Sequence, residues 1–144
     1  MNIQQIEKAA IEFRNAIEAC SSELGISFQS FPKGSCGDAT DLLGTYLIEN
    51  GLGNFSYFYG DVSSKVNNIW SSHAWLQLDE LVVDITADQF PEISQKVMVC
   101  SKSEWHTTLN GKFSHIADYR LINAPSINLD AIYKKIISHI TVLS

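Results

Sequence analysis

The sequence has few basic residues and no long apolar run. It holds 10 Lys and Arg residues against 16 Asp and Glu residues, a formal net charge of -6. Binding to a phosphate backbone or an anionic membrane needs an excess of positive charge, so neither partner is expected. No segment approaches the roughly 20 apolar residues that cross a bilayer, and residues 1–7 lack the positive start of a signal peptide. We therefore expect a cytoplasmic protein.

Cysteine is also scarce. Cys20, Cys36 and Cys100 are an odd number and lack Cys-x-x-Cys spacing, so neither a disulfide framework nor a zinc knuckle is expected. Repeats, low-complexity tracts and Pro/Gly/Ser-rich linkers are absent too. With 45% hydrophobic and 18% charged residues, we expect residues 1–144 to form one globular domain.

Two amphipathic helices are predicted in the first third of the chain. The first has an apolar stripe at steps of three and four, and Gly25 reads as its stop signal. The second begins at Ser35, whose hydroxyl is expected to pair with Asp38 in a capping box, so that Cys36 falls in the first turn. The two stripes are Ile3, Ile6, Ala10, Phe13, Ile17, Cys20 and Leu24, and Leu42, Leu43, Tyr46 and Leu47.

A β-hairpin is predicted for residues 73–86, with 79 and 80 as its loop. This loop length places Leu76 opposite Val83 and makes one face wholly apolar. His73 and Asp84 then share the other face as diagonal neighbours. A loop of odd length would separate them and also scatter the apolar residues, so burial of the core selects the register that brings them together.

The rest of the chain completes an α+β pattern of helices packed on an antiparallel sheet. We expect strands at 55–60, 96–100 and 118–122, a loop at 61–72, and a final helix whose apolar residues include Ile132, Ile136, Ile137 and Ile140. Cys20 is expected in the core, and Cys100 at the end of an apolar strand.

Cys36, His73 and Asp84 together suit nucleophilic catalysis. A thiol becomes a thiolate more easily at a helix N-terminus or beside an imidazolium, and a carboxylate holds the imidazole in the required tautomer. First-turn amides of the Cys36 helix can stabilise an oxyanion. Gln29 and Gln89 are candidates for a second oxyanion donor, and the candidates for a substrate groove are Trp70 and Trp75.

These segments resemble the transglutaminase-like superfamily. Residues 34–43 are similar to its nucleophile helix, residues 57–60 to the strand that follows, His73-Ala74-Trp75 to its His-Ala-Trp segment, and residues 83–86 to its Val-Asp-Pro-Thr segment, with Ile85 in place of proline. The family's chain order of Cys, His and Asp is kept. The resemblance implies a papain-like core with Cys36, His73 and Asp84 as its catalytic residues.

The expected function is cleavage or transfer at an amide bond of a protein or peptide through a Cys36 thioester, without a cofactor or metal. Peptidases, glutamine deamidases and acyltransferases belong to such a family. So do inactive binding domains, which form the alternative. A metal site of Cys36, His106 and His115 is a further, less supported hypothesis. A catalytic domain cut from a longer effector or toxin also fits, and the sequence does not indicate an oligomeric state.

Overall fold

The computed structural model describes residues 2–63, 70–122 and 128–143. A five-stranded antiparallel sheet has the order β4-β3-β2-β1-β5, which confirms the expected α+β class. The helices are α1 (Ile3–Cys20), α2 (Cys36–Glu49), α3 (Glu104–Thr107) and α4 (Leu129–Leu143), and the strands are β1 (Ser56–Ser63), β2 (Trp70–Leu78), β3 (Leu81–Asp84), β4 (Met98–Ser101) and β5 (Lys112–Ile116).

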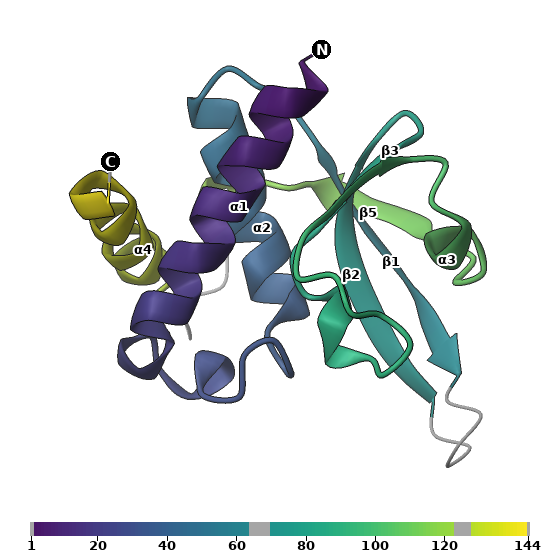
Figure 1. Cartoon of the computed structure of the whole chain (residues 1–144), viewed down its shortest axis with the longest axis horizontal. Coiled ribbons are helices and arrows are strands. Elements are labelled where there is room, and N and C mark those ends of the chain that lie inside the picture. Colours follow the sequence, from purple (N-terminus) through teal and green to yellow (C-terminus); the bar gives the residue numbers. More distant parts are fainter. Residues whose placement is uncertain (1, 64–69, 123–127, 144) are drawn as a thin grey trace.

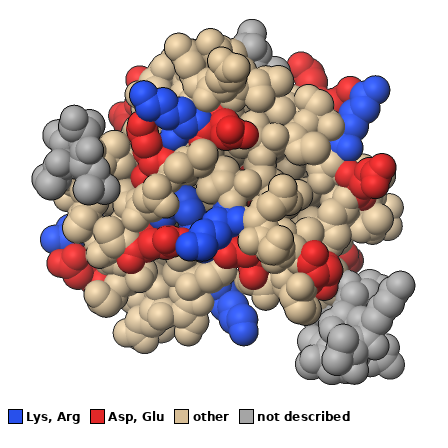
Figure 2. All heavy atoms as spheres, in the orientation of Figure 1, with Lys and Arg blue, Asp and Glu red and all other residues tan. Residues whose placement is uncertain are grey.

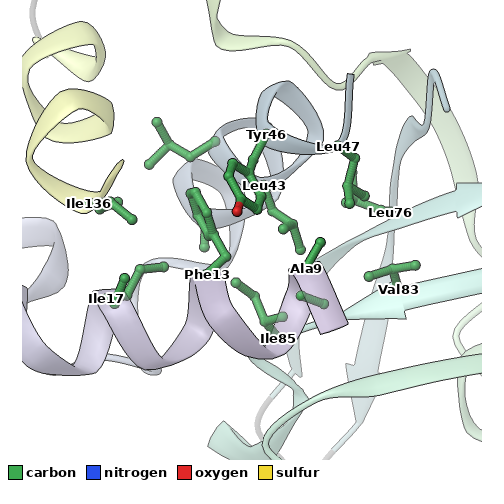
Figure 3. Packing of buried hydrophobic residues seen from close by; sticks show 14 of the residues in the cluster. Ala9, Phe13, Ile17, Leu43, Tyr46, Leu47, Leu76, Val83, Ile85 and Ile136 are labelled. Atoms are coloured by element: carbon green, nitrogen blue, oxygen red, sulfur yellow. The ribbon is translucent and has the colours of Figure 1, made fainter. Parts of the chain in front are cut away.

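The main core lies between the helices and one face of the sheet. In Figure 1, α1, α2 and α4 stand on one side of the strands and the short α3 on the other. Figure 3 shows side chains of α1 and α2 meeting those of the sheet, with Ile136 of α4 on the helix side of the same cluster. The labelled residues are Ala9, Phe13 and Ile17 of α1, Leu43, Tyr46 and Leu47 of α2, Ile136 of α4, and Leu76, Val83 and Ile85 from the sheet side.

The hairpin has the predicted register, with Leu76 opposite Val83 and Leu78 opposite Leu81. The ladder ends at Leu76 and Val83. The same register would place Ala74 opposite Ile85, but that pair does not form because β3 stops at Asp84. Its other face is buried as well, in a second cluster around Trp75. Residues of that cluster are Val62, Trp75, Val82 and Leu109, with Phe58, Phe90 and Trp105 packed against them.

One buried cation joins α1 to the segment after β3. Arg14 is 3% exposed, and its guanidinium donates to the carbonyl of Ile85 at 2.7 Å and to both carboxylate oxygens of Asp88 at 2.8 and 2.9 Å. It also lies over the ring of Phe31, 4.7 Å from the centroid. Phe31 precedes the nucleophile helix and Ile85 follows Asp84, so Arg14 fixes the two segments that carry the candidate catalytic residues.

Several expected elements differ. The first helix ends at Cys20, and a 3-10 turn, Ser21–Glu23, separates it from Gly25. Residues 119–121 form a 3-10 turn instead of a strand, because the Asp118 carboxylate accepts from the Arg120 amide at 3.0 Å and caps the turn. Strands β1 and β2 extend into the expected loop, of which residues 64–69 lie outside the described part. Helix α3 and strand β5 were not expected.

The surface matches the mixed composition. Acidic and basic side chains are interspersed on the face shown in Figure 2 and form no large patch of one sign there. Within the described ranges, the helices are all too short or too polar to traverse a bilayer.

Candidate active site

Cys36 is the first residue of α2 and is partly exposed. The first backbone hydrogen bond of the helix runs from Ala39 N to Ser35 O at 2.8 Å, so the N–H groups of residues 36–38 lie before it. The expected capping box is wrong. Ser35 makes no capping bond, its hydroxyl lies 3.4 Å from the Pro32 carbonyl, and the Asp38 carboxylate pairs with Ser27 instead. The N-terminal amides are therefore not taken up by the Ser35 side chain.

Strand β2 supplies two groups to the thiol. The His73 side chain and the backbone amide of Ala74 lie close enough to the thiol of Cys36 for their hydrogen bonding to lower its pKa. Pairing with β3 ends at Leu76, so Ala74 has no partner residue on β3, and α2 packs against β2.

His73 and Asp84 form a buried pair, as the hairpin register predicts. Nε2 of His73 lies 2.6 Å from Oδ2 of Asp84, and the two residues are 0% and 2% exposed. The amide of Thr86 donates to Oδ1 of Asp84 at 2.9 Å and fixes the carboxylate plane. Because Nε2 is engaged with Asp84, Nδ1 is the nitrogen left to face the thiol. The ring also contacts Phe90 at 5.2 Å between centroids, which helps to exclude water.

The charges of this cluster favour a thiolate and imidazolium. Burial opposes ionisation of Cys36, but the hydrogen bond and charge of His73 and the amide of Ala74 outweigh it and lower the pKa of the thiol. Burial likewise opposes the charge on His73, yet Asp84 and Cys36 raise its pKa to about 9. Asp84 has a lowered pKa despite full burial, because His73 and His106 stabilise the carboxylate. At neutral pH His73 is therefore the protonated partner.

A second imidazole contacts the same carboxylate. Nε2 of His106 lies 2.7 Å from Oδ2 of Asp84, and its Nδ1 lies 2.6 Å from the hydroxyl of Ser103, the N-cap of α3. From the sequence, His106 is a possible metal ligand and the first alternative for the base, and its contact with Asp84 is not predicted. Ser103 at three residues before His106 is a helix-cap signal, but nothing local in the sequence brings this helix to Asp84.

The geometry of this cluster is that of a hydrogen-bond network and not of a metal-binding site. Within the described ranges, His73, Asp84 and His106 are the group whose ligand atoms lie within 4.8 Å of one another. However, both ring nitrogens point at one carboxylate oxygen from 2.6 and 2.7 Å, the distances of charge-assisted hydrogen bonds. The site expected from Cys36, His106 and His115 is not assembled, since His115 pairs with Asp41 at 2.8 Å.

The remaining candidates fall in different places. Nε2 of Gln89 lies 3.4 Å from Nδ1 of His73 and donates to the Thr86 carbonyl at 3.0 Å, so Gln89 belongs to the site. Gln29 is exposed at the end of the turn Ile26–Phe28. Trp75 is 1% exposed and packs in the second cluster, and it also borders a cavity of about 340 Å³ whose described lining does not include Cys36, so its role in a substrate groove stays a prediction. The side chain of Trp70 lies outside the described residues.

A pocket of about 630 Å³ begins one residue beyond Cys36. Gly37 borders it, and a Cβ at Gly37 would lie only 3.0 Å from the hydroxyl of Tyr57. Burial and the negative charges of Cys36, Asp41 and Asp38 raise the pKa of Tyr57 to about 12, so this hydroxyl stays protonated. The far wall is apolar and consists of Ile116, Leu121, Ile122 and Leu129.

No protein-family model matches this chain, and no curated protein or solved structure is significantly similar to it. The resemblance of its motifs to the transglutaminase-like superfamily is therefore a hypothesis about function, to be weighed with the geometry of the site.

Cys36 is expected to be the most reactive of the three thiols at acidic and neutral pH. Cys20 is fully buried and donates to the Ala16 carbonyl at 3.1 Å, and burial raises its pKa. Cys100 is exposed on β4, which corrects the expectation that its strand protects it. Limiting iodoacetamide at pH 6, followed by peptide mass spectrometry, should modify Cys36 first, because thiolate reacts and ordinary thiols have a pKa of about 8.5. Faster labelling of Cys100 at pH 6 would contradict the lowered pKa of Cys36.

The thiol should also discriminate between reagents by charge. Asp38 and Asp41 line the pocket beside Cys36, and its described lining residues include no Lys or Arg. At pH 7.5 a cationic methanethiosulfonate should modify Cys36 faster than an anionic one, by on the order of 10-fold at low salt. Asp38→Asn should reduce that ratio, and Asp61→Asn, an exposed site on β1, should leave it unchanged. Equal rates for both reagents in the unmodified protein would count against an electronegative entrance.

Proposed function

We propose that this protein is a thiol-dependent enzyme of the transglutaminase-like kind, which attacks amide bonds of a protein or peptide. Cys36 is the nucleophile, His73 the general acid and base, and Asp84 the residue that orients and stabilises the imidazolium. The observation that carries the proposal is the buried pair of His73 and Asp84, 2.6 Å apart. The other ring nitrogen of His73 is left for the thiol of Cys36 at the start of α2. A helix-borne thiol facing a histidine on an antiparallel sheet also supports a papain-like core.

Acylation begins when the Cys36 thiolate attacks the amide carbon. A C–S bond forms and the carbonyl electrons move to oxygen, which becomes an oxyanion. As the tetrahedral intermediate collapses, the C–N bond breaks and Nδ1 of His73 gives its proton to the leaving nitrogen. The products of this step are a thioester on Cys36, a free amine or ammonia, and neutral His73 held through Nε2 by Asp84.

Deacylation restores the site. His73 takes a proton from water or from an acceptor amine as that nucleophile attacks the thioester, and the C–S bond breaks to return the thiolate. Water yields a carboxylic acid, as in a peptidase or deamidase, and an amine yields a new amide, as in an acyltransferase. The three reactions share all steps at Cys36 and differ in the leaving group and the acceptor.

Oxyanion stabilisation is assigned to the start of α2 and to Gln89. The amides of residues 36–38 lie before the first helical hydrogen bond, so they are available to a developing negative charge. Gln89 adds a side-chain amide beside Nδ1 of His73, at 3.4 Å. Gln29 is exposed, and it is the weaker candidate of the two.

The competing function is a binding domain that has lost activity. Such a domain has no need for a buried carboxylate that stabilises an imidazolium next to a thiol, because burying those charges costs folding free energy. The charge network around Asp84 therefore favours the enzyme. The binding domain predicts that Cys36 forms no thioester with any substrate.

A mass-spectrometric screen separates the two. Peptide libraries and cell lysates are incubated with the protein and searched for losses or gains of mass that mark hydrolysis, deamidation or transfer. The changes should vanish with Cys36→Ala and persist with Cys100→Ser, which removes an exposed thiol outside the site. Changes that persist in Cys36→Ala would refute the proposed nucleophile.

A further inference from the structure

Asp84 is shared by two imidazoles, although one is sufficient for a catalytic triad. His73 approaches Oδ2 from β2 at 2.6 Å and His106 approaches the same oxygen from α3 at 2.7 Å. All three side chains are at most 2% exposed. The mechanism proposed above assigns His106 no step, so this buried and fully hydrogen-bonded ring needs an account of its own.

Ser103 determines what His106 offers to the carboxylate. Its hydroxyl oxygen accepts from the His106 amide at 3.3 Å and lies 2.6 Å from Nδ1 of the same residue. When the hydroxyl proton points at Nδ1, the ring proton must be on Nε2, from which it is donated to Asp84. When His106 is protonated on both nitrogens, Nε2 still donates. In either state His106 is a hydrogen-bond donor to Asp84.

We propose that His106 is a positioning residue of the active site, which keeps the Asp84 carboxylate ionised and limits how tightly the carboxylate holds the proton of His73. The inference rests on the proposed function, because it concerns the step in which His73 releases that proton. Once the leaving group has taken the proton, Asp84 is a buried carboxylate without a cationic partner at His73. The N–H groups of His106 and Thr86 then stabilise it.

Among the described residues, the titratable groups that act on Asp84 are the two imidazoles, and Thr86 adds only uncharged donors. The groups that shift its pKa are His73 and His106, and His73 in turn faces Cys36 of α2. Beyond His106 lies a cavity of about 340 Å³ on the α3 side of the sheet. Glu80 and Lys102 border this cavity and pair with each other at 3.9 Å.

The sign of the effect does not depend on the charge of His106. Removing a donor, whether neutral or cationic, leaves the carboxylate more basic. A more basic carboxylate stabilises the imidazolium of His73 more strongly, so His73 loses its proton at a higher pH. The residue that holds Asp84 in place therefore also makes His73 a better acid toward the leaving group.

The test compares His106→Phe, which keeps a ring but no donor, with His106→Gln, which keeps an amide donor. The adjoining cavity gives room for either side chain. The pKa of His73 is measured by NMR titration of its ring carbon protons, assigned with His73→Ala. We expect His106→Phe to raise it by roughly half a pH unit or more above the unmodified protein, and His106→Gln to stay close to it.

A purely structural role for His106 predicts a different pattern. In that case both variants should have a lower melting temperature, while the pKa of His73 in His106→Phe should equal that of the unmodified protein. That result would overturn the inference. If His106→Phe does not fold, Ser103→Ala carries the same test, with a smaller shift in the same direction expected and an unshifted His73 overturning the inference. The pH dependence of Cys36 alkylation in the unmodified protein is measured alongside. An ordinary thiol pKa there would instead refute the proposed function.

Discussion

Turnover by the His73→Ala variant is expected to fall by about 10²–10⁴-fold, the loss that removal of a general acid and base produces. Cys36→Ala should abolish turnover, because no other group at the site can form the thioester. Asp84→Asn should lose clearly less. The thiol of Cys36 has further support from the amide of Ala74 and from its helix start, so it depends less on the carboxylate than a serine hydroxyl would.

The structure also explains why Asp84→Asn is not silent. One oxygen of Asp84 accepts from two imidazoles and the other accepts from the Thr86 amide. Every group around the carboxylate is thus a donor. An asparagine has one oxygen and one NH₂ group, so one of its ends must face a donor that it cannot accept from. The imidazole of His73 is then held less firmly and partly in the wrong tautomer.

Kinetics on a substrate from the mass-spectrometric screen would measure the three losses. His139→Ala on α4 is the matched control, since it removes a surface imidazole that lies 3.8 Å from Glu23 and outside the site. His73→Ala leaves Asp84 buried with a single imidazole, so folding must be verified by circular dichroism at the assay temperature. Full activity in folded His73→Ala would mean that the base is elsewhere, and His106 on the same carboxylate would be examined first.

Local patterns were enough to predict the hairpin that carries His73 and Asp84. Alternation of apolar residues on both sides of a two-residue loop allows one register that buries them, and this register puts His73 and Asp84 on one face. The periodic stripe of α1 was likewise readable, because its apolar residues except Ile3 meet the same core. Ile3, the first residue of the helix, is 44% exposed.

Features that depend on long-range approach were not predictable. His106 reaches Asp84 only because the segment after β3 returns along β4 to α3. No periodic pattern of apolar residues in that segment predicts this arrangement. The capping box failed for a related reason. Ser35 has φ -124° and ψ 9°, outside the usual N-cap conformation. Asp38 pairs with Ser27, which lies in the turn Ile26–Phe28 before α2.

The largest stability effect outside the catalytic residues is expected at Arg14. Arg14→Met should lower the free energy of unfolding by about 3–5 kcal/mol, the cost of breaking a buried ion pair from one side. It leaves Asp88, whose side chain is 15% exposed, without its bidentate partner, and it removes the donor to the Ile85 carbonyl. Nothing in the sequence around Arg14 signals this role, because Asp88 is 74 residues away.

Urea unfolding of Arg14→Met and Lys8→Met measures the effect against a matched control on the same helix. Lys8 is a surface cation, 79% exposed and 3.9 Å from Glu12, and its loss should cost less than about 1 kcal/mol. Arg14→Met combined with Asp88→Leu should recover part of the stability, since no carboxylate then stays buried without a partner. Because Ile85 follows Asp84 and Asp88 precedes Gln89, folded Arg14→Met should also show slower alkylation of Cys36. Equal losses in Arg14→Met and Lys8→Met would show that the buried guanidinium does not hold this part of the site.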